Sequence, residues 1–217
     1  MKDLTVIFLT VNNVPEKWAE YHKKVLLEAI GDAPIITMSM KPLDWGINVL
    51  QDGEPSVSNI YRQMLRASNI ADTDYVAIAE DDTLYPKEHF KFRPPLDKFA
   101  YNMSRWGILS WMEHPAYYYR HRESNSTLIA PRKLLIQCLE QYPDGAFGEV
   151  GKERVMKKLG LDYKAIRFYS QIPVVNFSHK NAIDELEQRE KKSETKALRA
   201  YDIPHWGRAE ELVKYFI

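Results

Sequence analysis

The chain has 217 residues, 45% of them hydrophobic and 28% charged, which is the composition of an ordinary globular domain with a sizeable core. Lysine plus arginine equals aspartate plus glutamate at 30 each, so the net charge gives no sign of a nucleic-acid or membrane partner, although a local basic patch is compatible with it. The single Cys138 excludes an intrachain disulfide and a cysteine-rich zinc site, and no apolar run predicts a signal peptide or a membrane span. We therefore expect a soluble, cytoplasmic protein without membrane insertion.

The first part of the chain alternates between predicted strands and helices. The predicted elements, in chain order, are a strand over residues 4–11, a helix over 16–30, a strand over 34–40, an irregular loop over 41–53, a helix capped by Ser56 and a strand over 75–79. The first strand is a continuous apolar, β-branched run, which is typical of a strand buried on both faces of a parallel sheet. This order predicts an α/β fold with a mostly parallel, doubly wound sheet, helices on both faces, and ligands at the carboxyl ends of the strands.

The second part of the chain is less regular. It predicts a charged connection over residues 86–98, strands over 106–111 and 126–130, helices over 131–141 and 150–158, and a strand over 172–177. Residues 181–199 are rich in charge and poor in large apolar groups, which indicates a solvated helix or a mobile tail. Residues 201–217 regain enough aromatic and aliphatic side chains to dock back on the body.

Three consecutive acids, Glu80, Asp81 and Asp82, directly follow the third predicted strand. Alternation along a strand places Glu80 and Asp82 on one side and Asp81 on the other. Two carboxylates about 4 Å apart repel each other by about 4 kcal/mol at an effective dielectric of 20. The acids either form a wet turn, in which solvent absorbs this repulsion, or bind a divalent cation. Their position at the end of a strand of near-ideal composition favours a metal and phosphate site.

This order and spacing of elements resembles the glycosyltransferases of the GT-A fold, closest in style to family 2 nucleotide-sugar transferases, over about residues 4–180. Glu80, Asp81 and Asp82 stand where that family has its Asp-x-Asp-type motif, with Glu80 in place of the usual first aspartate. The resemblance implies a Rossmann-like GT-A fold with a nucleotide-binding half over residues 1–85 and an acceptor half over 86–180. Residues 181–217 are then a charged helical extension.

The resemblance also implies roles for individual residues. Asp82 would bind Mn²⁺ or Mg²⁺, and Glu80 would contact the ribose, the donor sugar or the metal through water. His179 falls where the family has a late histidine that completes the metal or phosphate site, and the alternative is a surface histidine after a strand. Such a cation would neutralise the charge that builds on the departing nucleoside diphosphate.

The catalytic base of inverting members is a carboxylate at the amino end of a helix in the acceptor half. Glu149 resembles it, although Val150 stands where an aspartate is expected. Glu153 is the competing candidate, and the alternative role for Glu149 is to stabilise the start of the helix. A positioned carboxylate of this kind contributes about 10²–10⁴-fold to the rate.

Further residues are expected to bind the two substrates. The expected donor-binding residues are Thr10, Val11, Asn12, Asp44, Arg62, Asp81 and Lys180. The expected acceptor-binding residues belong to an aromatic and basic cluster and are Trp111, His114, Tyr118 and Arg120. Aromatic faces stack on sugars or bases, so the acceptor is a glycan, a small hydroxylated molecule or a modified base in DNA.

The resulting hypothesis is a metal-dependent, inverting glycosyltransferase that moves a sugar from a nucleotide-sugar donor to a hydroxyl acceptor. A nucleotidyltransferase of related fold is the alternative enzyme, but residues 12–17 lack the glycine-rich loop that usually follows the first strand in that class. A non-catalytic nucleotide- or sugar-binding module is the third reading. The sequence leaves the oligomeric state open.

Overall fold

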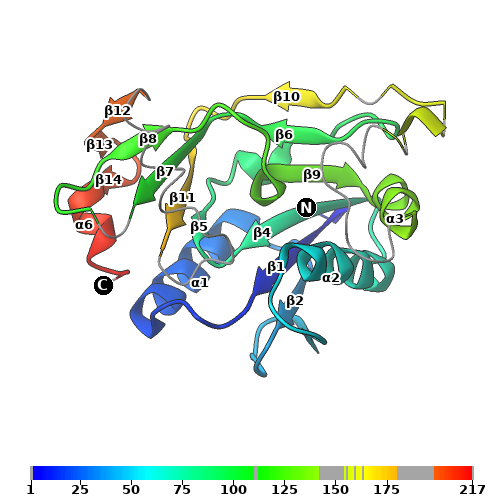
Figure 1. Ribbon diagram of the computed structural model, residues 1–217, viewed down its shortest axis with the longest axis horizontal. Helices are drawn as coiled ribbons and strands as arrows, with labels where there is room; N and C mark the ends of the chain where they lie inside the picture. The colour runs from blue at the N-terminus through cyan, green and yellow to red at the C-terminus, as the bar shows by residue number, and fades with distance from the viewer. Residues whose placement is uncertain are drawn as a thin grey trace.

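The structure, a computed structural model, describes residues 2–109, 112–141, 154, 156–158, 160–162, 164–179 and 198–216. A seven-stranded sheet forms its centre (Figure 1). In sheet order its strands are β10 (Ile166–Phe168), β6 (Ala100–Asn102), β9 (Leu128–Pro131), β4 (Tyr75–Glu80), β1 (Leu4–Thr10), β2 (Ile35–Ser39) and β3 (Ile47–Leu50). The sheet is mostly parallel, because β3, β2, β1 and β4 run in one direction, whereas β9 is antiparallel to both of its neighbours.

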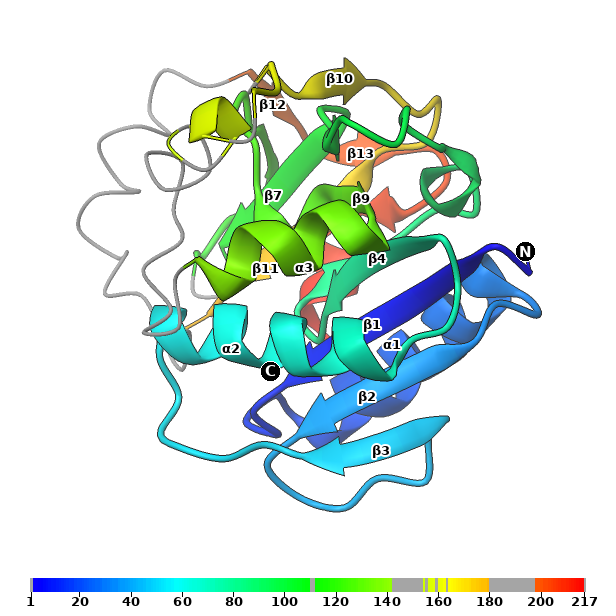
Figure 2. The ribbon, with the colours of Figure 1, turned by 90° about the vertical axis from the view of Figure 1, so that its right-hand side faces the viewer.

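Helices cover both faces of this sheet, α1 (Glu16–Ile30) on one face and α2 (Val57–Ile70) with α3 (Arg132–Glu140) on the other (Figure 2). The alternation of side chains along β1 divides them between two cores. Val6 and Phe8 belong to the core on the α1 face, and Ile7 and Leu9 belong to the core on the α2 and α3 face. All seven residues of β1 are buried, as its sequence predicts, and the predicted α/β fold is confirmed.

The start of α2 also follows the sequence. Ser56 has an extended backbone, and its hydroxyl accepts a hydrogen bond from the backbone N–H of Asn59 at 3.0 Å. This contact satisfies one of the backbone donors that the first turn of a helix leaves without a partner. Cys138 of α3 is fully buried in the same core as α2, where it packs as a small apolar residue.

Some elements differ from the sequence-based prediction. The predicted irregular loop over residues 41–53 contains β3, an edge strand whose ends Ile47 and Leu50 are exposed, so it lacks the continuous apolar run of a buried strand. The predicted strand over residues 126–130 begins as a 3₁₀ turn, η2 (Asn125–Thr127). A second such turn, η1 (His89–Lys91), lies in the charged connection.

A second, five-stranded sheet lies beside the first. In sheet order its strands are β12 (Arg199–Ala200), β8 (Tyr117–Tyr119), β7 (Arg105–Leu109), β11 (Val174–Ser178) and β5 (Thr83–Leu84). β5 begins immediately after the acidic residues that end β4 and pairs with β11. The acidic turn over residues 80–82 therefore lies at the junction of the two sheets.

The described carboxy-terminal segment, residues 198–216, is part of this body and is mostly not helical. After β12 it forms the antiparallel pair β13 (Asp202–Ile203) and β14 (Gly207–Arg208), followed by the short helix α6 (Ala209–Val213). Trp206, Leu212 and Phe216 share a core with Trp18 of α1, so the predicted docking of this segment is confirmed. Within the described part of the chain, no helix combines the length and apolarity needed to cross a membrane.

Candidate functional site

A pocket of about 430 Å³ lies at the carboxyl ends of β1 and β2, beside α1. Its lining includes four of the predicted donor-binding residues, Thr10, Asn12, Asp44 and Asp81. The volume falls within the range of about 300–1,000 Å³ that is typical of small-molecule sites. The exit of the first strand and the acidic turn, far apart in the sequence, thus meet at one pocket.

Asn12 fixes the mouth of this pocket. Its backbone has φ 56°, a left-handed conformation that asparagine tolerates better than most residues. Its side-chain Oδ1 accepts hydrogen bonds from the backbone N–H groups of Met40 at 2.8 Å and Lys41 at 2.9 Å. The exits of β1 and β2 are therefore tied to each other by one side chain.

An aromatic wall, which the sequence analysis did not single out, closes one side of the pocket. It consists of Phe8, His22 and Trp45, with ring centroids of Phe8 and Trp45 4.2 Å apart. The indole Nε1 of Trp45 is buried and has no hydrogen-bond partner. Trp45 is held by its own backbone, because its carbonyl oxygen accepts the Thr37 hydroxyl at 2.7 Å and Gly46, with φ 63°, turns the chain behind it.

His22 of this wall is a neutral side chain. Burial lowers its pKa to about 4, although its hydrogen bonds to backbone groups oppose that shift. Its Nε2–H donates to the carbonyl oxygen of Thr83 at 2.8 Å, directly after the acidic turn. The ring therefore acts as a flat wall and as a support for the turn, and does not add charge to the pocket at neutral pH.

Asp81 presents its carboxylate to the pocket. It accepts the hydroxyl hydrogen of Thr10 at 2.5 Å, and the same hydroxyl oxygen accepts the backbone N–H of Asn12 at 2.9 Å. Burial, followed by the charge of Asp82, raises the pKa of Asp81 to about 7, and the bond from Thr10 opposes this shift. Asp81 is therefore poised to gain or lose a proton near neutral pH, depending on what binds beside it.

Glu80 and Asp82 lie on the other side of the turn, as alternation predicts. Burial, followed by the charge of Asp82, raises the pKa of Glu80 to about 8. Burial also raises the pKa of Asp82, against the opposing charge of His179 and a hydrogen bond from the Thr83 hydroxyl at 2.8 Å. His179 follows β11 and feels the charge of Asp82 in return. The structure therefore brings Glu80, Asp82 and His179, the three predicted metal-site residues, into one electrostatic group.

Arg105 is a member of this group that the sequence analysis missed. Its side chain is 4% exposed at the start of β7, and its Nε and Nη1 are buried without a hydrogen-bond partner, whereas Nη2 donates to Asn176 Oδ1 at 3.2 Å. Burial, followed by the charges of Arg120 and Arg122, lowers its pKa to about 10, and the charges of Glu80 and Asp82 oppose this. A guanidinium with unused donors beside buried carboxylates is suited to bind an oxyanion.

Arg120, from the predicted acceptor cluster, lies next to Arg105. Its backbone N–H donates to the Arg105 carbonyl oxygen at 2.9 Å, and its Nη2 lies 3.4 Å from Ser178 Oγ. Gly107 makes room for the guanidinium, because a Cβ on that residue would lie 2.5 Å from Arg120 Nε. Both arginines are thus built into the second sheet and are not displayed on an open surface.

The donor set of the acidic turn meets the needs of a metal ion only in part. Within the described residues, no group of three or more histidine, cysteine, aspartate and glutamate side chains could hold a metal ion by itself. Asp82 and His179, whose charges interact, are the two candidate ligands. Mg²⁺ is often bound through one or two carboxylates together with substrate phosphates, so the pair fits a cation that arrives with a diphosphate.

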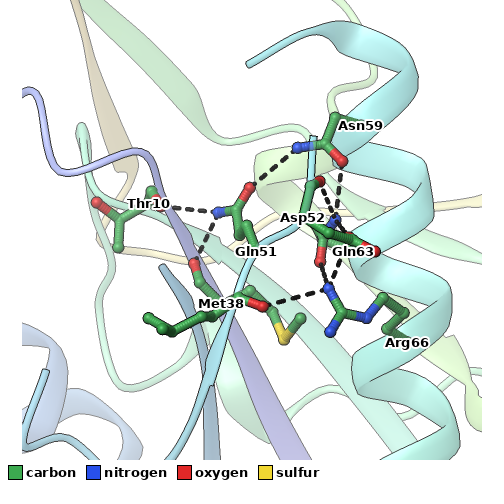
Figure 3. Close-up of polar contacts among 8 residues, drawn as sticks. Thr10, Met38, Gln51, Asp52, Asn59, Gln63 and Arg66 are labelled. Atoms are coloured by element: carbon green, nitrogen blue, oxygen red, sulfur yellow. Dashed lines mark hydrogen bonds and ion pairs between the residues drawn. The ribbon is translucent and has the colours of Figure 1, made fainter. Parts of the chain in front are cut away.

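A chain of polar side chains behind the pocket supports the end of β1 (Figure 3). The Gln51 amide Nε2 donates to the carbonyl oxygens of Thr10 at 2.8 Å and Met38 at 2.9 Å, and its Oε1 accepts from Asn59 at 3.2 Å. On α2, Gln63 connects Asn59 to the ion pair of Arg66 with Asp52, whose N–O distance is 2.8 Å. Gln51 thus ties the end of β1 to the end of β2 through one carbonyl group of each strand.

The remaining predicted residues lie elsewhere. Val11 is half-buried after β1, Arg62 is exposed on α2 on the face opposite to the pocket, His114 is exposed before β8, and Tyr118 is 2% exposed in β8. The ring of Tyr118 is covered by Arg199, whose guanidinium carbon is 5.2 Å from the ring centroid. Trp111, Glu149 and Lys180 lie outside the described residues, as do Val150 and Glu153.

Comparison with known proteins shows that this chain is similar in fold to several solved structures. No protein-family model and no curated protein matches the chain. A 4-diphosphocytidyl-2C-methyl-D-erythritol synthase from Anaerococcus prevotii is similar at 10% identity and a TM-score of 0.48, over 77% of this chain and 87% of that one. A putative nucleotide-diphospho-sugar transferase from Desulfovibrio desulfuricans is similar at 12% identity and a TM-score of 0.40, over 78% of this chain and 80% of that one. A glycosyltransferase involved in the glycosylation of the major capsid of PBCV-1 is similar at 9% identity and a TM-score of 0.47, over 80% of this chain and 92% of that one. At these TM-scores the likeness carries no inference about activity.

Proposed function

We propose that this chain is a glycosyltransferase that uses a nucleotide-sugar donor and Mn²⁺ or Mg²⁺ to glycosylate a hydroxyl group. The observation that supports this most is the division of the acidic turn. Asp81 faces a pocket of nucleoside size, whereas Asp82 lies with His179 and Arg105 on the other side. A nucleoside in the pocket would place its diphosphate at the turn, where both sides meet.

The pocket offers complementary groups to a nucleoside. The face of Trp45 suits a flat base, and the carboxylates of Asp44 and Asp81 can accept hydrogen bonds from base N–H groups or from ribose hydroxyl groups. Asp81 is already oriented by Thr10, so it needs little reorganisation to receive a ligand. Binding of a hydroxyl donor favours the charged form of Asp81 and lowers its raised pKa.

The other side of the turn suits a diphosphate. Arg105 would oppose the negative charge of the diphosphate through its own positive charge, which already acts on Glu80 and Asp82. Asp82 and His179 would hold the metal ion together with the diphosphate. When bound, such a cation acts as a Lewis acid that stabilises the charge of the leaving diphosphate.

We propose that Glu149 deprotonates the acceptor hydroxyl, which would give inversion. A glycan or a small hydroxylated molecule is the favoured acceptor. A modified base in DNA fits less well, because Arg105 and Arg120 are buried and the net charge is +0, whereas DNA-binding surfaces expose basic side chains.

The test measures release of nucleoside diphosphate from a panel of UDP-, GDP- and CMP-sugars, with and without Mn²⁺. For CMP-sugars the released product is the monophosphate. We expect turnover of at least one donor that depends on the metal and is lost in Asp82→Ala. Arg105→Lys keeps the charge but loses the planar fork, so we expect weaker donor binding. Asp97 is exposed and does not line the pocket, so Asp97→Ala provides the matched control.

Two outcomes would contradict the proposal. Release of pyrophosphate from a nucleoside triphosphate, without donor-sugar turnover, would identify a nucleotidyltransferase. Binding of a nucleotide sugar without any turnover across a panel of sugar acceptors would identify a binding module.

A further inference from the structure

Phe216, which follows the end of α6, contacts three rings that surround the acidic turn. Its side chain is 7% exposed. Its ring centroid lies 4.7 Å from that of Trp18, 5.0 Å from that of Phe177 and 5.1 Å from that of His179. The rings of Phe216 and Phe177 are nearly parallel, with an angle of 7° between their planes. Phe216 thus links α1, β11 and the residue after β11.

Each of these three neighbours is connected to the acidic turn. The indole Nε1–H of Trp18 donates to the carbonyl oxygen of Asp81 at 2.7 Å. The backbone N–H of Phe177 donates to the carbonyl oxygen of Asp82 at 2.8 Å. His179 and Asp82 lie close enough for their charges to interact. Two hydrogen bonds and one electrostatic interaction therefore connect the turn to residues that touch one phenyl ring.

We infer that Phe216 is a positioning residue for the acidic turn, so that residues 209–216 form part of the candidate site. Trp18 and Phe177 can hold the Asp81 and Asp82 carbonyl groups in place only while their own positions are fixed. Phe216 fixes them by filling the space between the two rings and the His179 imidazole. Its effect on substrate binding rests on the proposed function, whereas its effect on the geometry of the turn does not.

The segment that carries Phe216 is itself anchored on α1. Lys17 Nζ donates to the carbonyl oxygen of Lys214 at 2.9 Å, and the rings of Tyr21 and Tyr215 stack with centroids 4.3 Å apart. Tyr201, at the other end of the described carboxy-terminal segment, is 64% exposed. It provides a matched control, an aromatic residue on the same segment that lies outside the core around Phe216.

The experiment compares Phe216→Leu with Tyr201→Leu in the full chain. Solvent exchange of the Trp18 Nε1–H, assigned with Trp18→Phe, is measured by NMR, and binding of UDP with Mn²⁺ is measured by calorimetry. We expect faster indole exchange and about tenfold weaker binding in Phe216→Leu, because misplacing site groups by about 1 Å costs up to about 10²-fold in activity. We expect wild-type values for both in Tyr201→Leu.

Equal indole exchange in the two folded variants would overturn the inference. If Phe216→Leu does not fold, the inference is tested in the wild-type protein by nuclear Overhauser contacts from the Phe216 ring to the Trp18 and His179 rings. The absence of these contacts would overturn the inference. If wild-type protein binds neither UDP nor another nucleoside diphosphate, the proposed function fails, but the exchange of the Trp18 indole still tests the positioning role.

Discussion

The turn behind Trp45 gives a prediction whose size can be worked out from the structure. Gly46 has φ 63°, and a Cβ added there would overlap the carbonyl oxygen and the side chain of Ile35. Ile35 begins β2, which is paired with β1 on one side and with β3 on the other, so its backbone cannot move aside without disturbing strand pairing. Gly46→Ala therefore forces the loop, and Trp45 with it, away from the sheet.

Two costs add in this variant. A left-handed backbone costs a non-glycine residue about 1–2 kcal/mol. Overpacking a filled site costs a further 1–3 kcal/mol or so. Together they predict a loss of about 2–5 kcal/mol in the free energy of unfolding, and a chain of this size loses about 2–4 °C in Tm for each kcal/mol.

Gly207→Ala is the matched control, because Gly207 has φ 79° but a Cβ there would meet nothing within 4 Å. We expect this variant to lose only the backbone cost, about 1–2 kcal/mol. Urea denaturation gives both free energies, and calorimetry with UDP shows whether the Trp45 wall has moved. Equal stability of the two variants would refute the steric reasoning, and unchanged nucleotide binding in folded Gly46→Ala would refute the role of the wall.

Two further predictions concern buried polar groups. Burial lowers the pKa of His89 to about 3, and its Nε2 has no hydrogen-bond partner, so the unfolded chain takes up a proton below pH 6.5 that the folded chain refuses. Stability should therefore fall as the pH drops from 6.5 towards 3, by about 2 kcal/mol at pH 5 from this residue, and His89→Gln should show a flatter profile in urea titrations. Thr10→Val removes the hydroxyl that bonds Asp81 and Asn12, and we expect a loss of about 1–3 kcal/mol in stability together with weaker UDP binding. Thr5→Val, which breaks the bond to Thr73 at the other end of β1, should lower stability and leave UDP binding unchanged; equal binding loss in both would argue against a local role for Thr10.

The pocket and the acidic turn could be predicted where local periodicity determines the geometry. The apolar sequences of β1 and β4 show that both strands are buried. The alternation of side chains along β4 continues into the acidic turn, so Asp81 could be assigned to the opposite side from Glu80 and Asp82. Thr10 and Asn12 could be placed in the pocket because parallel strands end at one edge of a sheet.

The missed residues depend on contacts between distant parts of the chain. Trp45 reaches the pocket only because Gly46 and Thr37 fix its loop against β2. Arg105 begins a short strand, where an arginine is usually exposed, and its burial follows from pairing with β8 and β11. The carboxy-terminal segment showed enough apolar residues to predict docking, but its strand pairing with β8 has no local signal.

The division of β1 between two cores has a consequence for changes in chain length. Insertion or deletion of one residue inside β1 would exchange the side chains beyond the change between the two helical layers, so that small and large groups would meet the wrong partners. A shift confined to the last residues of β1 would instead turn the Thr10 hydroxyl towards α2 and leave Asp81 without its donor. A single substitution in β1 therefore leaves the facing of its other side chains unchanged. A one-residue insertion or deletion disturbs both the packing of the two cores and the hydrogen bond from Thr10 to Asp81.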